Sequence, residues 1–362
     1  MGYKRQNLLS ILTVLCTICI ASNAQTSNDP DDIIDKMVLK VKQSNGKLES
    51  AVNSNEIKKL YQSFKNKYRP NNKLQSSQSG NIKEFENNVK KIILNNLKFE
   101  NNTISFKTGL NQYTDMTLDE RFKYTGLMLP KSQSNVTYFK PPKVDKAKLT
   151  AASVDWTRYC PPIENQGNCG SCWAFGGAVV VEALHGKKTG QPVSVSKQEL
   201  VDCVPKTESY GCNGGLMDSV LKMAKNQGLT ETRSYPYAEK DGCCRRSSRQ
   251  PSIKISSYNK VNKKDVINAL ATSPVTIGIS LGEPFFAYRS GVLDDKQCKG
   301  YNGQAHAAGH AVAVVGHGTE NGKQYLKIRN SWGNTWGDNG YLKYALDTFY
   351  ICDMDDSYIA TI

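Results

Sequence analysis

The chain has 362 residues, enough for two or three domains or for one larger enzyme with a sizeable core. Hydrophobic residues make up 39% and charged residues 22%, which excludes a disordered or a fibrous protein. The formal net charge is +14, but residues 1–149 carry 24 Lys/Arg against 13 Asp/Glu, and residues 150–362 carry 23 against 20. The excess of positive charge therefore belongs to the first part of the chain, and we expect no nucleic-acid partner.

Residues 1–24 have the pattern of a secretory signal peptide. Two basic residues precede a 13-residue apolar run, 8–20, and small residues follow at Ser22 and Ala24. This run is shorter than the ~20 residues that a transmembrane helix needs, so we expect no membrane anchor. The sequence predicts a cut after Ala24 and export of the remaining chain.

Residues 25–149 contain no cysteine and many Lys, Asn and Ser. Residues 71–80 and 139–149 have the composition of exposed loops or linkers. Between them, residues 82–97 place apolar side chains at helical spacing and predict an amphipathic helix. Asn101 and Asn135 each begin an Asn-x-Thr sequon, so both are candidate glycosylation sites in an exported chain.

From residue 150 onward cysteines become frequent, and all four tryptophans and all four histidines appear. Apolar periodicity predicts helices over 171–185, 217–226 and 264–271, and strands over 275–279, 311–315, 324–329 and 341–344. Helices precede strands. This order predicts an α+β fold of two packed subdomains, one mainly helical and one an antiparallel sheet, with a site at their interface.

The residues that could carry chemistry lie in three separated segments of this second part. Cys172 lies in the segment QGNCGSCWAF (166–175), His310 precedes an apolar strand, and Asn330 follows another. A nucleophilic cysteine needs a helix N-terminus and an imidazolium beside it, because both lower its thiol pKa. His310 would be this partner and Asn330 would orient its ring. Gln166 and the backbone N–H of Cys172 would stabilise an oxyanion.

The cysteines and histidines could also serve two other kinds of site. A redox Cys-x-x-Cys pair of Cys169 and Cys172 would need a βαβ pattern around it, and a zinc site would need paired Cys-x2-Cys motifs. The sequence contains neither pattern. Nucleophilic catalysis without a metal or other cofactor is the preferred interpretation.

The three segments, in this order, resemble the active-site motifs of the papain family of cysteine proteases, and most of all its cathepsin L group. The first part resembles a cathepsin L-like propeptide, although the Glu and Arg expected upstream are replaced by Ser77 and Asn81. The matching propeptide residues are Phe85, Asn88, Ile92 and Asn96 in a helix motif, and Gly109, Asn111, Tyr113 and Asp115 in a motif that has Phe where this chain has Tyr. The resemblance covers about residues 61–362.

This resemblance implies a papain-like fold with a helical left part and a β-barrel-like right part, preceded by a mainly helical propeptide. The domains would be a signal peptide (1–24), an inhibitory propeptide (25–149) and a peptidase domain (150–362). The protein would be an endopeptidase made as an autoinhibited zymogen. The alternative, from another class, is a catalytically idle papain-fold protein that binds or inhibits.

The resemblance also implies partners and a location. The partners would be protein and peptide substrates, the chain's own propeptide and cystatin-like inhibitors. We expect residues 61–124 of the propeptide to occupy the cleft. We expect a monomer that is extracellular or lysosomal.

Substrate-binding residues follow from the same resemblance. The pocket for the side chain two residues before the scissile bond would be apolar and suited to Leu or Phe, and Asp355 or Asp356 at its floor would accept Arg. Which of these two acids reaches the pocket is open. The implied substrate-binding residues are Gly170, Ser171, Gly214, Gly215, Leu216, Met217, Gly278, Ala308, Gly309, Trp332 and Trp336.

Nine cysteines follow residue 24, and this odd number requires at least one thiol without an internal partner. The resemblance leaves Cys172 free. It would join Cys169 to Cys212, Cys298 to Cys352, and Cys203 to either Cys243 or Cys244. Cys160 and the remaining member of the pair Cys243 and Cys244 would then form a fourth bridge.

Overall fold

The structure is a computed structural model that describes residues 29–69, 81–130, 137–141, 154–246, 253–298 and 309–362. The chain divides into two compact units, residues 1–75 and residues 76–362. The predicted signal peptide, the predicted linker 71–80 and the proposed boundary at residue 149 lie outside the described residues. Within the described part, no helix combines the length and the apolar character needed to cross a membrane.

Among its described residues, 29–69, the first unit contains three helices, α2 (Pro30–Gln43), α3 (Leu48–Ala51) and α4 (Ser54–Tyr68). Asp29 caps α2 by accepting a hydrogen bond from Asp31 N, and Asn53 caps α4 in the same way. Each of the two longer helices buries one apolar face, for example at Val41 and Phe64. The sequence pattern did not predict these helices.

The second unit begins with three elements of the predicted propeptide: α5 (Ile82–Glu100), β1 (Phe106–Thr108) and α6 (Leu118–Phe122). The predicted helix over 82–97 is confirmed and extends three residues further. Asn81 stands where the propeptide motif has Arg, and here it caps α5 by accepting from Lys83 N and Glu84 N. The candidate glycosylation site Asn101 is the exposed residue that ends α5, whereas Asn135 lies outside the described residues.

Buried asparagines of the helix motif connect α5 to the extended segment that follows it. Asn96 Nδ2 donates to Thr108 O (2.9 Å), and Asn96 Oδ1 accepts from Thr108 N (2.9 Å). Asn88 Nδ2 donates to Thr114 O (2.8 Å). These side chains satisfy backbone groups that would otherwise be buried without partners, so the motif does more than pack a helix face.

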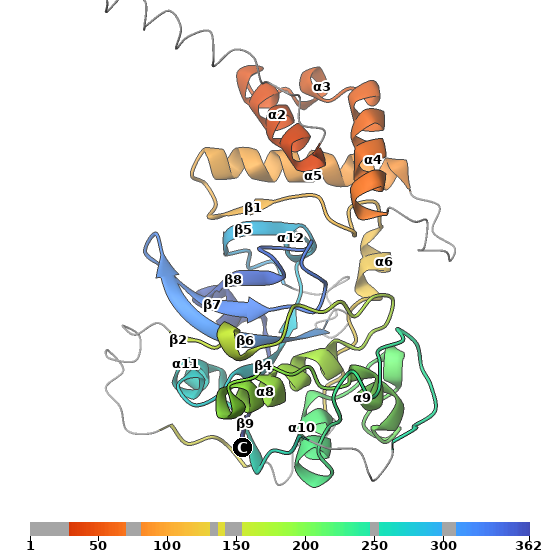
Figure 1. The fold of residues 1–362 in the computed structure, drawn as a ribbon. Helices are drawn as coiled ribbons and strands as arrows, with labels where there is room; N and C mark the ends of the chain where they lie inside the picture. Colours follow the sequence, from red (N-terminus) through yellow and green to blue (C-terminus); the bar gives the residue numbers. More distant parts are fainter. Residues whose placement is uncertain (1–28, 70–80, 131–136, 142–153, 247–252, 299–308) are drawn as a thin grey trace, which may run out of the picture. The chain divides into compact units, whose positions relative to one another are not determined.

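The helical part of the peptidase region is built around α8 (Cys172–Thr189). This helix is buried on nearly all sides, so its sequence is apolar all round rather than amphipathic. It ends at Gly190, whose φ of 77° places it in the left-handed region that glycine adopts without strain. Figure 1 shows α9 (Lys197–Cys203) and α10 (Met217–Asn226) on the same side of the sheet as α8.

The sheet has nine strands in the order β1-β5-β8-β7-β6-β4-β9-β3, and β2 pairs with β6. Its pairs are antiparallel except for β5 with β8. Asn321 and Gly322, both with positive φ, make the tight turn between β6 and β7. The bounds are β2 (Val154–Asp155), β3 (Ser257–Lys260), β4 (Val275–Ser280), β5 (Tyr288–Leu293), β6 (Gly309–Glu320), β7 (Lys323–Arg329), β8 (Tyr341–Ala345) and β9 (Asp353–Thr361).

The remaining helices are short: α11 (Val266–Leu270), α12 (Glu283–Phe286) and α13 (Leu346–Cys352). The helices predicted over 171–185 and 217–226 and all four predicted strands are confirmed within a few residues at each end. The helix predicted over 264–271 is a 3-10 turn at Lys263–Asp265 followed by α11. The predicted α+β class, with a helical part and a largely antiparallel sheet, is confirmed.

Residues of the predicted propeptide lie at both ends of the strand order. At one end β1 pairs with β5, with Phe106 opposite Gly291, and Figure 1 shows the two strands side by side. At the other end Tyr138 forms a bridge to Lys260 of β3. The propeptide therefore supplies the outermost strand at one end and a single bridge to β3 at the other.

Candidate active site

Cys172 is the first residue of α8 and is completely buried in this form of the protein. Its position places the sulfur at the positive end of an 18-residue helix dipole, which favours a thiolate. The backbone of Ala311, the residue after His310, is close enough to this sulfur to lower the pKa of the thiol. The strand that carries His310 is thus placed against the N-terminus of α8.

His310 lies on β6 and is oriented by Asn330, which directly follows β7. His310 Nε2 lies 2.8 Å from Asn330 Oδ1. Ser331 N also donates to this oxygen (2.8 Å), which identifies it as the amide oxygen. An amide oxygen only accepts, so Nε2 carries the proton. In the neutral ring, Nδ1 therefore has a free lone pair, and Nδ1 is buried without a hydrogen-bond partner.

Aromatic side chains surround this hydrogen bond. The ring of Trp332 lies 4.7 Å from that of His310, between centroids, and Trp336 packs edge-on against Trp332. Both tryptophans are completely buried. Trp332 therefore shields the His310–Asn330 hydrogen bond from water, and Trp336 packs against Trp332.

Burial controls the charge state of the two groups. It raises the pKa of Cys172 to about 11, against the opposing effect of backbone hydrogen bonds. It lowers the pKa of His310 to about 4, although the hydrogen bond to Asn330 acts in the opposite direction. In this closed form both groups are neutral at pH 7.

Gln166 directs its side-chain amide toward the place expected for an oxyanion. Its Nε2 donates to the carbonyl oxygens of Tyr124 and Cys169, both at 2.9 Å. Its Oε1 accepts from Ser331 Oγ (2.6 Å), which fixes the orientation of the amide. The Tyr124 carbonyl is therefore bound by the group that we expect to bind an oxyanion.

An extended segment of the propeptide, residues 124–128, passes directly over Cys172. Gly126 N donates to Cys172 Sγ (3.2 Å). Gly215 binds the segment on two sides, because its N–H donates to Gly126 O (3.0 Å) and its carbonyl accepts from Met128 N (3.0 Å). Leu127 N donates to Gly309 O (3.1 Å). The sequence predicts that residues 61–124 occupy the cleft. In the structure, the propeptide contacts with Gln166, Cys172, Gly215 and Gly309 begin only at Tyr124.

The close approach of this segment requires a glycine at position 126. A Cβ at Gly126 would lie 1.9 Å from the carbonyl oxygen of Gly170. Gly214 is close as well, because a Cβ there would lie 2.9 Å from Gly126 O. Gly170 and Gly214, both predicted to bind substrate, thus form walls of the cleft. Ser171 is buried beside them, with its hydroxyl bonded to Tyr237 (2.7 Å).

The predicted specificity pocket is filled by Leu127. A Cβ on Gly278 would lie 2.5 Å from Leu127 Cδ2, so this glycine makes room for the side chain. Gly309 borders the same space next to Met354, a residue that sequence reasoning missed. Of the other predicted pocket residues, Met217 is buried at the start of α10 and Leu216 is half-buried just before it, while Ala308 lies outside the described residues.

Asp356 is the acid that reaches this pocket. A Cβ on Gly278 would lie 3.5 Å from Asp356 Cβ, and Asp356 Oδ1 accepts from Tyr358 OH (2.7 Å). Burial raises the pKa of Asp356 to about 6. Asp355 has a positive φ of 53° and an exposed side chain directed to Lys263 Nζ (3.9 Å).

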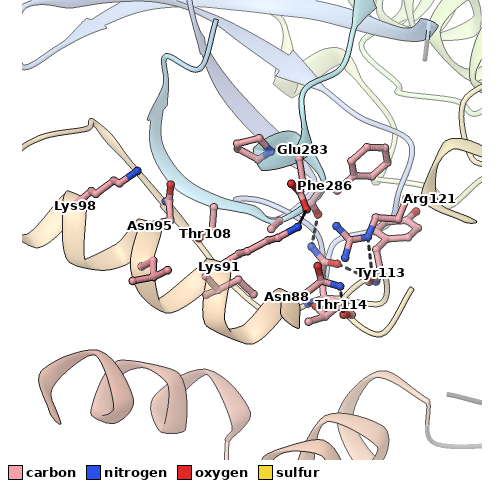
Figure 2. A pocket seen from close by; sticks show the side chains of 15 residues that line it. Asn88, Lys91, Asn95, Lys98, Thr108, Tyr113, Thr114, Arg121, Glu283 and Phe286 are labelled. Atoms are coloured by element: carbon pink, nitrogen blue, oxygen red, sulfur yellow. Dashed lines mark hydrogen bonds and ion pairs between the residues drawn. The ribbon is translucent and has the colours of Figure 1, made fainter. Parts of the chain in front are cut away.

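A second contact between propeptide and peptidase region lies away from Cys172. Figure 2 shows a cavity between α5 and residues 283–287, across which Lys91 Nζ pairs with Glu283 (2.5 Å). The cavity measures about 330 Å³, and Arg121 and Asn111 are among its lining residues. Asn111 Nδ2 donates to Phe286 O (2.7 Å). Because its lining includes neither Cys172 nor His310, this cavity is not the candidate catalytic site.

Other residues of the second propeptide motif pack nearby. Tyr113 lies edge-on to Trp332, with ring centroids 4.9 Å apart. Asp115 is buried, as are Phe85 and Ile92 of the helix motif. A Cβ on Gly109 would lie 2.6 Å from the side chain of Arg289, so this position also favours glycine. The motif residues thus form the contact between α5 and the peptidase region.

Three of the predicted disulfides are present: Cys169–Cys212, Cys298–Cys352 and, for the pairing left open, Cys203–Cys244. The predicted fourth bridge between Cys160 and Cys243 is wrong. Cys160 is buried with its thiol directed at Trp156 O, whereas Cys243 is exposed. A bridge needs both sulfurs in contact, so among the described cysteines Cys160, Cys172 and Cys243 are free.

An α+β fold that carries a thiol at a helix N-terminus, a His–Asn pair beside it and a propeptide strand across it defines a papain-like cysteine peptidase in zymogen form. Residues 150–362 match the family described as Papain family cysteine protease. The chain therefore belongs to the papain family of cysteine proteases.

Individual relatives place it among the cathepsin L-like members. It is 32% identical over 313 residues to a cathepsin L-like proteinase from Phaedon cochleariae, an alignment that covers 84% of this chain and 93% of the relative. It is 35% identical over 308 residues to cathepsin L from Sarcophaga peregrina, covering 80% and 88%. The solved structure of the digestive procathepsin L2 proteinase from the larval midgut of Tenebrio molitor is similar with a TM-score of 0.74 at 29% identity, covering 84% of this chain and 100% of that one.

Proposed function

We propose that this protein is an endopeptidase in which Cys172 is the nucleophile and His310 its proton partner. The orientation of His310 supports this assignment, because the Nε2–Asn330 hydrogen bond leaves Nδ1 available to the thiol. Asn330 is then a positioning residue, and Gln166 binds the oxyanion together with the backbone N–H of Cys172.

The reaction follows from these roles. The thiol proton moves from Cys172 Sγ to His310 Nδ1, and the thiolate attacks the carbonyl carbon of the scissile bond. The C–N bond breaks as the imidazolium gives its proton to the leaving amine, which leaves a thioester on Cys172. His310 then takes a proton from water, the resulting hydroxide attacks the thioester, and the acid product leaves as the thiol is restored.

We further infer that residues 124–128 keep the zymogen inactive, and the hydrogen bond from Gly126 N to Cys172 Sγ carries this inference. An N–H group offers the sulfur a proton and no electrophilic carbon, so the segment blocks the nucleophile without being cut. The Tyr124 carbonyl occupies the amide of Gln166, and Leu127 fills the pocket beside Gly278. Nucleophile, oxyanion site and pocket are occupied together.

The pocket supports a preference for Leu or Phe two residues before the scissile bond, since it already holds a leucine. Cleavage after Leu-Arg and Phe-Arg follows as the expected specificity. Export after a cut at Ala24, an extracellular or lysosomal location, glycosylation at Asn101 and Asn135, and binding of cystatin-like inhibitors remain predictions from the sequence.

Active-site titration of the processed protein with an epoxysuccinyl inhibitor tests the proposal. Stoichiometric labelling of Cys172, together with hydrolysis of a Phe-Arg substrate, is the expected result. Cys172→Ser should abolish both without unfolding the protein, because the side-chain volume barely changes. Cys243→Ser is the matched control, since it removes the exposed free thiol and should change neither. A processed protein that folds but neither binds the inhibitor nor turns over would instead favour an idle papain-fold binding protein.

A further inference from the structure

The β3 edge of the sheet holds a short segment of the propeptide by strand pairing. Lys260, the last residue of β3, donates its N–H to Thr137 O (3.0 Å), and its carbonyl accepts from Phe139 N (2.8 Å). β3 stands at one end of the strand order, with β9 as its neighbour on the inner side. When the propeptide leaves, both backbone groups of Lys260 lose their partners and the edge is open to another chain.

The side chains of this segment point to different surroundings. Phe139 is half-buried and packs against the hydrophobic core, whereas Tyr138 is 44% exposed. Beside them lies a cavity of about 270 Å³ whose lining includes Leu129, Lys260 and Met354. The surface under the segment thus combines a strand edge with an adjoining hollow.

This surface is continuous with the specificity pocket. Met354 lines the cavity, and a Cβ on Gly309 would lie 3.1 Å from Met354 Cε and 3.3 Å from Leu127 O. Met354 is therefore a wall shared by the cavity and the pocket that holds Leu127. A chain that leaves the pocket in this direction meets the cavity and then the β3 edge.

We propose that in the processed enzyme the β3 edge and the cavity wall that remains, which includes Lys260 and Met354, bind the part of an extended polypeptide substrate that lies N-terminal to the scissile bond. The inference rests on the proposed function. Leu127 fills the pocket assigned to the side chain two residues before the cut, so the residues after Leu127 mark the path of the N-terminal part of a substrate. Eleven positions separate Leu127 from Tyr138, so a substrate with about that many residues upstream of the pocket is long enough to reach the edge.

The chemistry of this surface indicates which kind of substrate can bind to it. Strand addition uses backbone N–H and C=O groups and therefore accepts many sequences, provided that the chain is extended and lacks proline at the paired positions. The half-buried position of Phe139 adds a preference for a large apolar or aromatic side chain. Unfolded or loosely folded proteins meet these requirements, whereas a dipeptide substrate that ends at the pocket has no residue to place on the edge.

Two substrates with the same cleavage site test the proposal on enzyme matured from the full chain. One is a short Phe-Arg substrate, and the other carries about 14 further residues on its N-terminal side with a Phe-Tyr-Thr stretch at the matching distance, because a substrate leaves the pocket toward its N-terminus and so runs opposite to the propeptide. We expect the longer substrate to have at least a fivefold higher kcat/KM, mainly through a lower KM. Equal kcat/KM values, with the short substrate still cleaved, would overturn this inference and leave the proposed function intact.

A competitor identifies the surface. The blocked peptide TYFKP, which reproduces residues 137–141, should slow hydrolysis of the long substrate at least fivefold and leave that of the short one unchanged. The same peptide with an N-methyl group on its phenylalanine nitrogen is the matched control, because it cannot donate to Lys260 O, and it should not inhibit. Equal inhibition by both peptides would overturn the proposal. So would an N-terminus of the mature enzyme before Thr137, since the segment would then still cover the edge.

Discussion

Lys197 and Glu182 form an ion pair that is buried on both sides and links the start of α9 to the helix that begins at Cys172. Lys197 also pairs with Glu164, two residues before Gln166. Lys197 and Glu182 are 1% and 0% exposed, so each charge depends on its partner for compensation. Removing the lysine leaves two buried or partly buried carboxylates facing each other.

Lys197→Met should therefore lower the free energy of unfolding of the zymogen by about 3–5 kcal/mol. Lys222→Met is the matched control, because Lys222 pairs with Glu208 at an exposed site and its loss should cost less than about 1 kcal/mol. Denaturant unfolding of the two variants measures the difference. Similar losses for both would mean that the buried pair contributes no more than a surface pair.

Acid should open the zymogen through His310. Burial in the closed form lowers the pKa of His310 to about 4, and we expect exposure to water on opening to return it toward its ordinary value of 6.5. A group with a lowered pKa in the closed form binds protons more tightly in the open form. The closed form is therefore favoured above about pH 6.5 and loses stability as pH falls toward 4.

Hydrogen exchange of residues 124–128 in a Cys172→Ser zymogen measures this opening without turnover. Exchange corrected for its intrinsic pH dependence should increase from pH 7 to pH 4. Adding His310→Gln should reduce the increase. His310→Gln should not remove the increase completely, because the closed form also depends on the buried Arg121 and on the carboxylates whose charges act on it, those of Glu84, Asp115, Glu120 and Glu283. Equal protection at both pH values would contradict the prediction.

Gly126→Ala should weaken the block of Cys172. The added Cβ would lie 1.9 Å from Gly170 O, so the segment must shift and its N–H must leave the sulfur. The zymogen should then react with an epoxysuccinyl inhibitor at least tenfold faster than the unaltered zymogen. Thr125→Ala, a change next to it that adds no atom, is the control and should react at nearly the original rate. A Gly126→Ala zymogen that stays unreactive would show that the block does not depend on this contact.

Asp356 should control acceptance of arginine two residues before the cut. Its raised pKa of about 6 means that it is mainly neutral below pH 6 and charged above, so the ratio of Arg-Arg to Phe-Arg cleavage should rise from pH 4 to pH 7. Asp356→Asn should remove this rise. Asp355→Asn should keep it, because Asp355 faces solvent and Lys263. If the ratio is independent of pH in all three proteins, only the apolar part of the pocket sets specificity.

Peptide mapping of thiols blocked after denaturation should find Cys160, Cys172 and Cys243 free in the region after residue 150. Alkylation before denaturation should reach Cys243 first, because it is exposed, whereas burial raises the pKa of Cys160 to about 12 and protects its thiol. Recovery of a peptide that joins Cys160 to Cys243 would contradict this arrangement and support four bridges.

The sequence predicted well where a physical requirement leaves few alternatives. The buried strands β4 and β6 have continuous apolar runs, and α10 was predicted to the residue by its amphipathic spacing. Cys172, His310 and Asn330 could be selected because the chemistry needs those residue types at a helix start and near strands. The structure brings His310 and Asn330 into hydrogen-bond contact, and it places Ala311, next to His310, against Cys172.

Other features depend on tertiary contacts that no local pattern contains. β9 begins with acids that suggest a solvated surface, yet Asp356 is buried beside Gly278. The odd number of cysteines shows that at least one thiol has no internal partner, but it does not show which sulfur atoms lie close together. Cys160 could therefore not be recognised as a buried free thiol. The segment 124–128 has neither helical nor strand periodicity, and only the groups that receive it, such as Gly215, give it a defined shape.

The propeptide strand β1 has a consequence for the life of the protein before any substrate is met. Since β1 pairs with β5 and Tyr138 pairs with Lys260 of β3, a chain that still carries its propeptide keeps the outer side of β5 and the end of β3 paired. Unpaired edges are the surfaces by which partly folded chains adhere to one another. Residues of the propeptide other than those over Cys172 therefore cover these strand edges, and we expect the full chain to aggregate less readily than the processed protein.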